Sequence, residues 1–428
     1  MILWLALAVN KPAMADEAAI LAETDARIIK NRTGTIRVQV LDKNGKPAAN
    51  TKIRLEHARH IFKFGAAYHQ QFPVERAPEN EIEQRHMDAF LKLFNYATVT
   101  FYWNQYEPQQ GNPDEVQRLA AITWMNQHGI GARGHPIFWN LDGIVPRWVN
   151  TRGTNYDALT RLMDTRLEGL SKNILPKLED ADVFNELVEW DRFTNAFTVL
   201  SQKEVKQPVT HYLKETMRLN PELKTVVNDY VTDKRFPELL KALIDGGAPI
   251  DIIGQQCHMH SGNWSVQHTW DILERLAKLN RPILFSELSI LSGAHRDNVN
   301  WSGHVNDWLT DPENEKAQAV YIEQFYKLVY SHPQSMGIVL WNFDDRQAWL
   351  GAPVGILRKD GTLKPSFEVL DQLINHKWRT NGECTTDSDG NIVVPNAYEG
   401  HYVVKTGNVS AKGDHSAGKP LTITLHLK

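Results

Sequence analysis

Two glutamates, Glu186 and Glu287, are the residues whose placement best fits a chemical role. Each lies at or near the end of a short apolar run, a pattern typical of a buried β-strand. Two facing carboxyl groups can cleave a glycosidic bond, because one protonates the leaving oxygen and the other attacks the sugar or activates water. We therefore expect a retaining glycoside hydrolase with Glu186 as acid/base and Glu287 as nucleophile. For either glutamate alone, a structural ion pair is the alternative.

The two carboxyls need different environments. The acid must hold its proton near neutral pH, and burial beside another carboxylate raises a carboxyl pKa. The nucleophile must stay ionised, which hydrogen-bond donors favour. His258 and Gln256 lie on the strand expected next to Glu287 and are the candidate donors.

Short apolar runs alternate with longer amphipathic runs from about residue 60 to 375. The apolar runs predict eight strands, at 62–68, 96–103, 129–139, 182–186, 225–230, 251–258, 282–289 and 337–343. Apolar residues at three-to-four spacing predict helices at 81–94, 114–128, 206–219, 266–279 and 315–331. Eight β/α repeats of this length predict an α/β protein with a (β/α)8 TIM barrel. No glycine-rich phosphate loop follows the first strand, which disfavours a dinucleotide-binding fold.

The active site of such a barrel forms at the carboxyl ends of its strands. Polar and aromatic residues gather at these expected ends, and we predict that they bind substrate: His135, Trp139, Asn185, Tyr230, Gln256, His258, Trp341 and Trp349. Trp349 follows a loop-like stretch and is the best candidate for stacking on a sugar ring. A satisfied core histidine is the alternative for His135, and packing alone is the alternative for the tryptophans and Tyr230.

The segments flanking the barrel have a different pattern. Residues 33–59 alternate apolar and polar side chains around an Asn-Gly turn, which predicts a β-hairpin. Residues 377–428 read as short strands, forming either a small C-terminal β module or strands that pack with that hairpin. We assign residues 60–376 to the barrel. Residues 1–15 contain a short apolar run and an Ala-Met-Ala cleavage pattern, which predict a signal peptide and a secreted or periplasmic protein.

Composition narrows the choice of partner. The 428 residues carry a formal net charge of −4 without a long basic run, which argues against nucleic acid or an anionic membrane. The two cysteines cannot form a disulfide framework, and neither lies in a CxxC pair. The 13 tryptophans favour a carbohydrate partner. We expect a monomer that acts on a polysaccharide or oligosaccharide with no cofactor and no metal.

At this point the motifs resemble glycoside hydrolase family 10, best known for endo-β-1,4-xylanases. The family's acid/base motif WDVVNE is similar to residues 181–186 (ADVFNE), and its nucleophile motif ITELD is similar to residues 285–289 (FSELS). Further matches follow in family order, at residues 133–140, 228–230, 254–258, 341–349 and 361–365. The resemblance implies that Asn185 bonds the sugar 2-hydroxyl and that His258 supports the nucleophile. The family histidine that ends the third-strand motif is Asn140 here, which we also predict to bind substrate.

One family motif is altered. In the family, a Glu, an Asn and a Lys on the second strand grip the sugar one position beyond the cleaved one. The corresponding residues 98–103 read TVTFYW, about two residues shorter, and none of the three is recognisable. Xylan remains the leading substrate, and a decorated or different β-glycan is the alternative.

Two other function classes share part of this residue pattern. A non-catalytic carbohydrate-binding or sensory barrel would keep the aromatic residues but lose one glutamate, and both are present. A metal-dependent barrel hydrolase could use His135, His258 and His260, but the first strand lacks the usual His-x-His.

Overall fold

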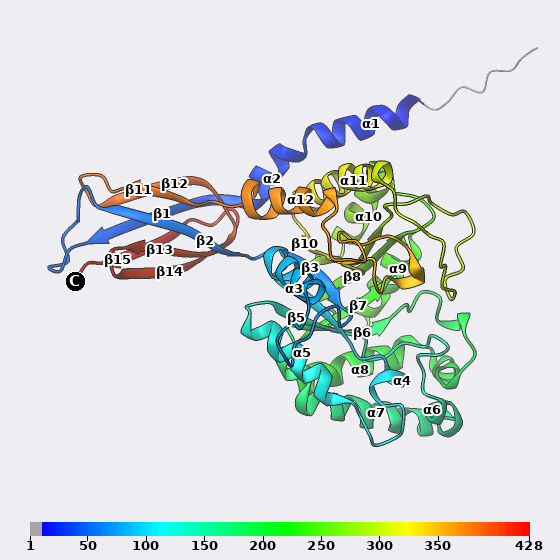
Figure 1. Cartoon of the computed structure of the whole chain (residues 1–428). Coiled ribbons are helices and arrows are strands. Elements are labelled where there is room, and N and C mark those ends of the chain that lie inside the picture. Colours follow the sequence, from blue (N-terminus) through cyan, green and yellow to red (C-terminus); the bar gives the residue numbers. More distant parts are fainter. Residues whose placement is uncertain (1–10) are drawn as a thin grey trace, which may run out of the picture.

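The computed structural model describes residues 11–428 and contains a closed barrel of eight parallel strands. The strands follow one another around the barrel in chain order, and the last pairs with the first (Figure 1). They are β3 (Lys63–Tyr68), β4 (Tyr96–Thr100), β5 (Gly131–His135), β6 (Asp180–Asn185), β7 (Lys224–Asp229), β8 (Ile252–Met259), β9 (Ile283–Ile290) and β10 (Ser335–Leu340). All eight predicted strands are confirmed, with shifts at their ends.

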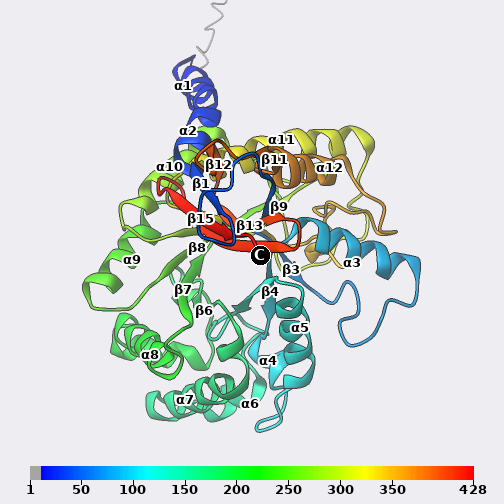
Figure 2. The ribbon, with the colours of Figure 1, turned by 90° about the vertical axis from the view of Figure 1, so that its left-hand side faces the viewer.

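Helices surround the barrel (Figure 2). The longer ones are α3 (Glu81–Leu93), α5 (Glu115–Gln127), α7 (Tyr156–Asn173), α8 (Lys206–Leu219), α9 (Arg235–Asp245), α10 (Val266–Ala277) and α11 (Pro312–Ser331). Short helices α4 (Trp103–Tyr106), α6 (Arg147–Arg152) and α12 (Pro365–Asp371) lie in the connections. Side-chain caps fix several starts; Asn80, for example, accepts a hydrogen bond from the Glu83 N–H at the first turn of α3. The five predicted helices are confirmed.

The barrel interior changes from apolar to polar along its axis. Its lower layer holds Tyr96, Val226, Ile252, Leu284 and Val339. Side chains alternate along a strand, so the residue two positions on faces the same way. One such step leads from Val226 to Asn228 on β7. The polar upper layer of the barrel interior therefore lies at the carboxyl ends of the strands.

Two β-bulges alter this alternation where the glutamates lie. On β9, Phe285 pairs with Gln255 but Glu287 pairs with Gln256, so Ser286 is an extra residue. On β6, the register against β7 shifts between Asp182 and Phe184. A bulge re-aims the side chains that follow it. Ser286 and Glu287 consequently both contact Asn228, which projects into the barrel.

A β-sandwich lies at one end of the barrel and combines strands from both ends of the chain (Figures 1 and 2). One sheet has the order β12-β1-β15 and the other β11-β2-β13-β14. The strands are β1 (Thr33–Leu41), β2 (Lys52–His60), β11 (Gly382–Thr385), β12 (Asn391–Tyr398), β13 (Gly400–Thr406), β14 (Val409–His415) and β15 (Leu421–His426). Of the two predicted arrangements for residues 377–428, the structure has packing with the N-terminal strands.

The predicted hairpin at residues 33–59 is wrong in its pairing. Both strands exist, but β1 and β2 lie in different sheets. The Asn-Gly turn does form, because Asp42 accepts bonds from the Asn44 and Lys46 N–H groups. The ladder ends at a single bridge from Leu41 to Pro47, because the Val40 N–H bonds the Gly390 carbonyl at 2.8 Å instead of continuing the pairing. The chain then crosses to the other sheet, and both strands bury their apolar faces in one shared core.

The sandwich cannot cover the rim that carries the glutamates. β2 ends at His60 and β3 begins at Lys63, so the sandwich joins the barrel where the strands start. Arg32 fastens this junction, bonding Glu399 of the sandwich at 2.9 Å and the Tyr330 carbonyl of α11 at 2.7 Å.

The N-terminal segment forms two helices, α1 (Lys11–Ala22) and α2 (Thr24–Arg32). The predicted signal peptide at 1–15 falls mainly on residues 1–10, outside the described part of the chain, and stays a prediction. Within residues 11–428, no helix has the length and apolar character required to cross a bilayer.

Candidate active site

Glu186 stands at the carboxyl end of β6 in a conformation unusual for its residue type. Its φ is +58°, in the left-handed region that non-glycine residues rarely occupy. A hydrogen bond of 2.8 Å from its N–H to the Asn228 carbonyl of β7 holds this backbone in place. Its carboxyl oxygen accepts from the Gln256 amide at 3.2 Å. The strained backbone turns the side chain into the barrel mouth, and such strain is concentrated at functional sites.

Glu287 is held on both of its carboxyl oxygens. Asn228 Nδ2 donates to Oε1 at 2.7 Å, and His258 Nε2 lies 3.1 Å from Oε2. The other ring nitrogen of His258 is 2.9 Å from the Ser289 hydroxyl, which fixes the plane of the ring. Only 4% of Glu287 is exposed. The carboxylate is therefore buried, oriented and supplied with donors.

Two asparagines connect the glutamates. Asn228 Nδ2 also donates to Asn185 Oδ1 at 2.8 Å, and Gln256 Nε2 lies 3.2 Å from that same oxygen. The Ser286 hydroxyl donates to Asn228 Oδ1 at 2.6 Å, so the amide orientation of Asn228 is determined by its partners. A continuous hydrogen-bond path thus runs from one carboxyl to the other.

The site drives the pKa values of the two carboxyls apart. Burial, together with the negative charge of Glu287, raises the pKa of Glu186 to about 8. Burial also acts to raise the pKa of Glu287, but His135, His258 and Arg133 outweigh it and lower that pKa to about 2. At neutral pH, Glu186 carries a proton and Glu287 is ionised. A site with this division can run acid and nucleophile chemistry together.

A buried polar group lies beneath Glu287. The Arg133 guanidinium binds Asp182, whose Oδ2 lies 2.5 Å from His135 Nδ1. His135 Nδ1 is also 3.9 Å from Glu287. Arg133, Asp182 and His135 are each at most 1% exposed. The contacts of His135 match the satisfied-histidine alternative, and its substrate-binding role stays a prediction.

Aromatic side chains form the wall of the rim. The Trp341 ring contacts the rings of His135 and His258, with centroids 5.2 and 6.0 Å apart. Trp349 contacts His258 at 4.9 Å. The Trp139 ring packs on Tyr102, and a hydrogen bond from the Trp139 side chain acts to lower the pKa of Glu186. The predicted aromatic residues therefore surround the carboxyl pair.

Two predicted residues have other partners. Asn140 donates to the Trp190 carbonyl, and its own carbonyl accepts from Asn195 at 2.6 Å. The Tyr230 hydroxyl donates to Glu189 at 2.5 Å. Their substrate-binding roles stay predictions.

Several residues of this site were absent from the predicted set: Tyr102, Arg133, Asp182, Asn228 and Ser286. Alternation along the strands was a signal for Asn228. No such signal existed for Ser286, because a bulge turns it inward.

The alternative of a metal-dependent hydrolase required His258 as a ligand. Both ring nitrogens of His258 already have partners, Glu287 and Ser289. Within residues 11–428, no group of three or more His, Cys, Asp or Glu side chains is arranged to hold a metal ion.

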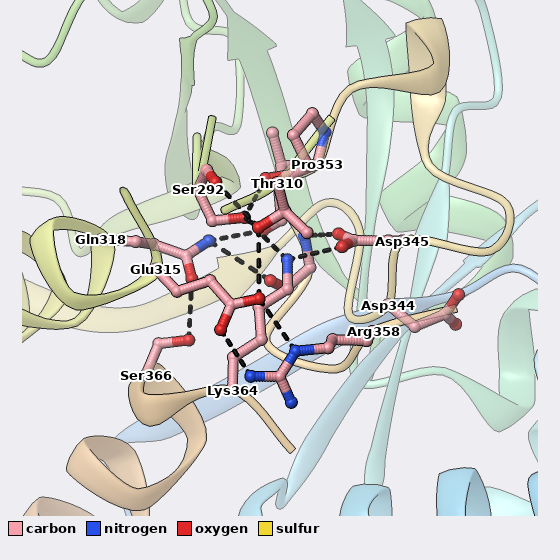
Figure 3. Close-up of polar contacts among 12 residues, drawn as sticks. Ser292, Thr310, Glu315, Gln318, Asp344, Asp345, Pro353, Arg358, Lys364 and Ser366 are labelled. Atoms are coloured by element: carbon pink, nitrogen blue, oxygen red, sulfur yellow. Dashed lines mark hydrogen bonds and ion pairs between the residues drawn. The ribbon is translucent and has the colours of Figure 1, made fainter. Parts of the chain in front are cut away.

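The loop that carries Trp349 is anchored by a buried ion pair (Figure 3). The Lys364 ammonium lies 2.6 Å from Asp345 and donates to the Ser292 hydroxyl at 2.8 Å. Asp345 also accepts from the Gly355 N–H at 2.9 Å. The Lys364 side chain is 0% exposed. The pair joins both ends of the loop to the segment after β9.

Replacing Lys364 by methionine should destabilise the protein by about 3–5 kcal/mol, because it leaves the Asp345 carboxylate buried without its cation. Urea denaturation would measure the loss. Lys359→Met changes an exposed lysine of the same loop and is the control. An additional Asp345→Asn substitution should recover part of the loss. Equal stability of the Lys364 and Lys359 variants would contradict this role of the pair.

Removing the charge of Glu287 should lower the pKa of Glu186 from its value of about 8, because that charge is the second largest cause of the shift. A carboxyl-carbon NMR titration of Glu287→Gln would measure it. Glu189→Gln, which removes a carboxylate at the rim that is not among the causes, is the control. An unchanged Glu186 pKa in Glu287→Gln would refute the electrostatic coupling.

Comparison with known proteins identifies the family. Residues 55–369, which include all eight barrel strands, match the model of Glycosyl hydrolase family 10. The chain belongs to glycosyl hydrolase family 10. The family motifs at Glu186 and Glu287 therefore lie in one site, as the resemblance implied.

Curated relatives of this family 10 chain differ in size from it. The anti-sigma-I factor RsgI6 of Acetivibrio thermocellus is 26% identical over 406 residues, covering 92% of this chain and 47% of that protein. Endo-1,4-beta-xylanase 1 of Arabidopsis thaliana is 25% identical, covering 69% of this chain and 28% of that protein. Endo-1,4-beta-xylanase B of Paenibacillus barcinonensis is 23% identical, covering 68% of this chain and 89% of that protein. The chain thus spans less than half the length of the first two.

Solved structures share the family 10 fold. A family 10 protein of Paenibacillus barcinonensis superposes with a TM-score of 0.62 at 19% identity, covering 73% of this chain and 95% of that one. Xylanase 10B of Thermotoga petrophila, solved with xylobiose, superposes with a TM-score of 0.61 at 17% identity, covering 74% of this chain and 95% of that one. At these identities the likeness supports the barrel fold alone.

Proposed function

We propose that this protein is a retaining glycoside hydrolase that cleaves β-1,4-linked glycans, with xylan as the leading substrate. The observation that carries the proposal is the pair of buried carboxyls with opposite pKa shifts, about 8 for Glu186 and about 2 for Glu287. A structural ion pair would need an opposite charge beside each glutamate, whereas the charge that acts most strongly on Glu186 is a second carboxylate, Glu287.

The geometry supports two chemical steps. In the first, a Glu287 oxygen attacks the anomeric carbon while Glu186 gives its proton to the leaving oxygen, so a glycosyl ester forms and the glycosidic bond breaks. In the second, Glu186 takes a proton from water, which attacks the same carbon and releases Glu287. Esterification removes the charge of Glu287, which lowers the pKa of Glu186 and prepares it to act as the base.

His258 and Asn228 would keep Glu287 ionised and aimed, since each contacts one of its oxygens. Asn185 stands between the carboxyls, where a sugar hydroxyl could take the place of its present partners. Trp341 and Trp349 would pack on the sugar rings, because aromatic faces match the apolar faces of sugars. These roles extend to this chain what the family motifs imply.

Xylan is proposed as substrate because several relatives are named endo-1,4-beta-xylanases. The altered second strand bears on this choice, because residues 98–103 read TVTFYW and none of the family's three polar grips is recognisable there. We also propose a secreted or periplasmic location, supported by the apolar run and the Ala-Met-Ala pattern near the N-terminus.

Product stereochemistry tests the mechanism. Proton NMR of the first seconds of xylan or xylotetraose hydrolysis should show the β-anomer as first product, because two displacements at one carbon restore its configuration. A first product with the α-configuration would mean a single displacement by water and would overturn the retaining mechanism. Parallel assays on xylan, arabinoxylan, glucuronoxylan and mixed-linkage glucan would rank the substrates.

A non-catalytic carbohydrate-binding barrel is the second candidate. One observation favours it: similarity to a protein named anti-sigma-I factor covers 92% of this chain, beyond the barrel match at 55–369. The carboxyl pair favours the enzyme. Glycan binding without any released reducing sugar would support the second candidate.

A further inference from the structure

A polar cavity of about 770 Å³ opens beside the candidate active site. It lies among the loop after β3, the carboxyl end of β4, the start of α5 and the loop after β10. Its volume falls in the usual range for small-molecule sites. Val99 and Thr100 of β4 are part of its lining. The cavity therefore adjoins the strand on which the family's glycone grips are missing.

One residue connects the cavity with the carboxyl pair. His69 lines the cavity, and its Nε2 lies 3.0 Å from the Trp341 carbonyl. The rings of His69 and Trp341 are 5.1 Å apart, and Trp341 contacts His135 beside Glu287. The charge of Glu287 also acts on the pKa of His69, which burial lowers. The wall of the cavity is therefore in direct contact with the wall of the candidate active site.

The cavity is rich in glutamines. Five line it, from four different segments of the chain: Gln70, Gln71, Gln105, Gln117 and Gln347. An amide offers two donors and one acceptor oxygen, which matches the alternating donors and acceptors of sugar hydroxyls. Gln105 and Gln347 are exposed, and their side chains have no hydrogen-bond partner within residues 11–428. Two amides from different segments of the lining are therefore available to a ligand.

The other glutamines shape the cavity. Gln71 is buried, and its amide oxygen accepts from the His69 N–H at 2.8 Å. Gln70 adopts a φ of +61°, a left-handed conformation that is costly for glutamine. Its amide donates to Gln117 at 3.3 Å. A strained backbone that aims a polar side chain into a cavity is a pattern found at ligand sites.

The charges around the cavity do not favour an anion. Arg76 pairs with Glu83 at 2.9 Å, and Arg118 pairs with Asp114. Among residues 11–428, Arg346 has no carboxylate partner and Glu75 has no cationic partner. Their opposite charges therefore offset each other within the lining. Amides outnumber free charges, which suits an uncharged ligand.

We propose that this cavity is a subsite for an uncharged sugar unit of the substrate, bound by Gln105 and Gln347 in place of the missing second-strand grip. The inference rests on the proposed glycanase function. It places substrate selection in the loops after β3, β4 and β10 rather than on the second strand. The chemical class of the ligand is a neutral pyranose linked to the sugar that is cleaved.

Binding and turnover can be tested separately. Xylotetraose binding to the Glu287→Gln protein, which should not hydrolyse it, would be measured by calorimetry with and without Gln105→Ala/Gln347→Ala. Each lost neutral hydrogen bond is expected to weaken binding about 2- to 10-fold, so the pair should raise Kd about 10-fold or more. Gln127→Ala, at the far end of α5 and exposed, is the control.

Kinetics provide the second readout. The ratio of kcat/KM for 4-nitrophenyl β-xylotrioside to that for the β-xyloside should fall about 10-fold in the double variant, whereas a general folding defect would lower both rates together. Equal Kd values for the double variant and its parent, or no xylotetraose binding at all, would overturn the subsite. Glutamine-dependent binding without hydrolysis would uphold the subsite and refute the proposed hydrolase instead.

Discussion

Replacing Glu287 by glycine should abolish hydrolysis of aryl β-xylosides, with a loss of about 10⁴-fold or more in kcat. The substitution removes the carboxylate whose pKa the site lowers to about 2 and whose two oxygens both have donors. Neither Asn228 nor His258 can replace it, since both are held as donors to that carboxylate. Release of 4-nitrophenol would measure the effect.

The cavity left by this side chain supplies a control within the same variant. Azide added at high concentration should occupy it, attack the anomeric carbon from the same face and yield an α-glycosyl azide. Glu222→Gly, an exposed turn residue before β7, should retain full activity. Normal turnover by Glu287→Gly would show that the nucleophile is assigned to the wrong residue.

Replacing Glu186 by alanine should separate substrates by their leaving groups. A sugar leaving group needs a proton on its departing oxygen, and loss of the general acid lowers the rate of cleavage about 10²–10⁴-fold. A 2,4-dinitrophenolate leaves without a proton, so the first step should be nearly unchanged and a burst of phenolate should precede slow release of the sugar. Stopped-flow absorbance would resolve the two phases.

The pH profile of this variant is equally informative. In the parent protein, kcat/KM should fall as pH rises through about 8, because Glu186 then loses the proton that it must donate. The alanine variant should lack this alkaline limb. Azide should restore its slow step and yield a β-glycosyl azide. A similar loss for both leaving groups would instead indicate damage to folding or binding.

Much of this architecture could be predicted from local patterns. Apolar runs of strand length, separated by amphipathic helices, predicted the eight barrel strands, because a parallel strand that is buried on both faces must be apolar along its length. The rule that polar groups gather at the carboxyl ends then brought Asn185, Glu186, Gln256, His258 and Glu287 to one rim. Each of these contacts another member of the set in the structure.

Long-range pairing was harder to predict. The alternation in residues 33–59 identified two strands correctly but could not say which neighbours they take. A hairpin is the shortest connection, yet β1 pairs with β12 and β15, and its partner in β15 lies 385 residues along the chain, as in the pair Ile36 and Leu421. The shared apolar core of both sheets decided this arrangement, and that core exists only after the two chain ends meet.

Residue type and strand order place the two glutamates at the fourth and seventh strands of a barrel, and both can be predicted because they are local properties of the chain. The difference between the two carboxyls arises only in the folded barrel. A bulge turns Ser286 and Glu287 inward together, and a left-handed backbone aims Glu186 at the same space. Burial then raises the pKa of Glu186, while His135, His258 and Arg133 lower that of Glu287. Electrostatic fields depend on distances between strands, and these distances are set by the closed barrel rather than by any one segment.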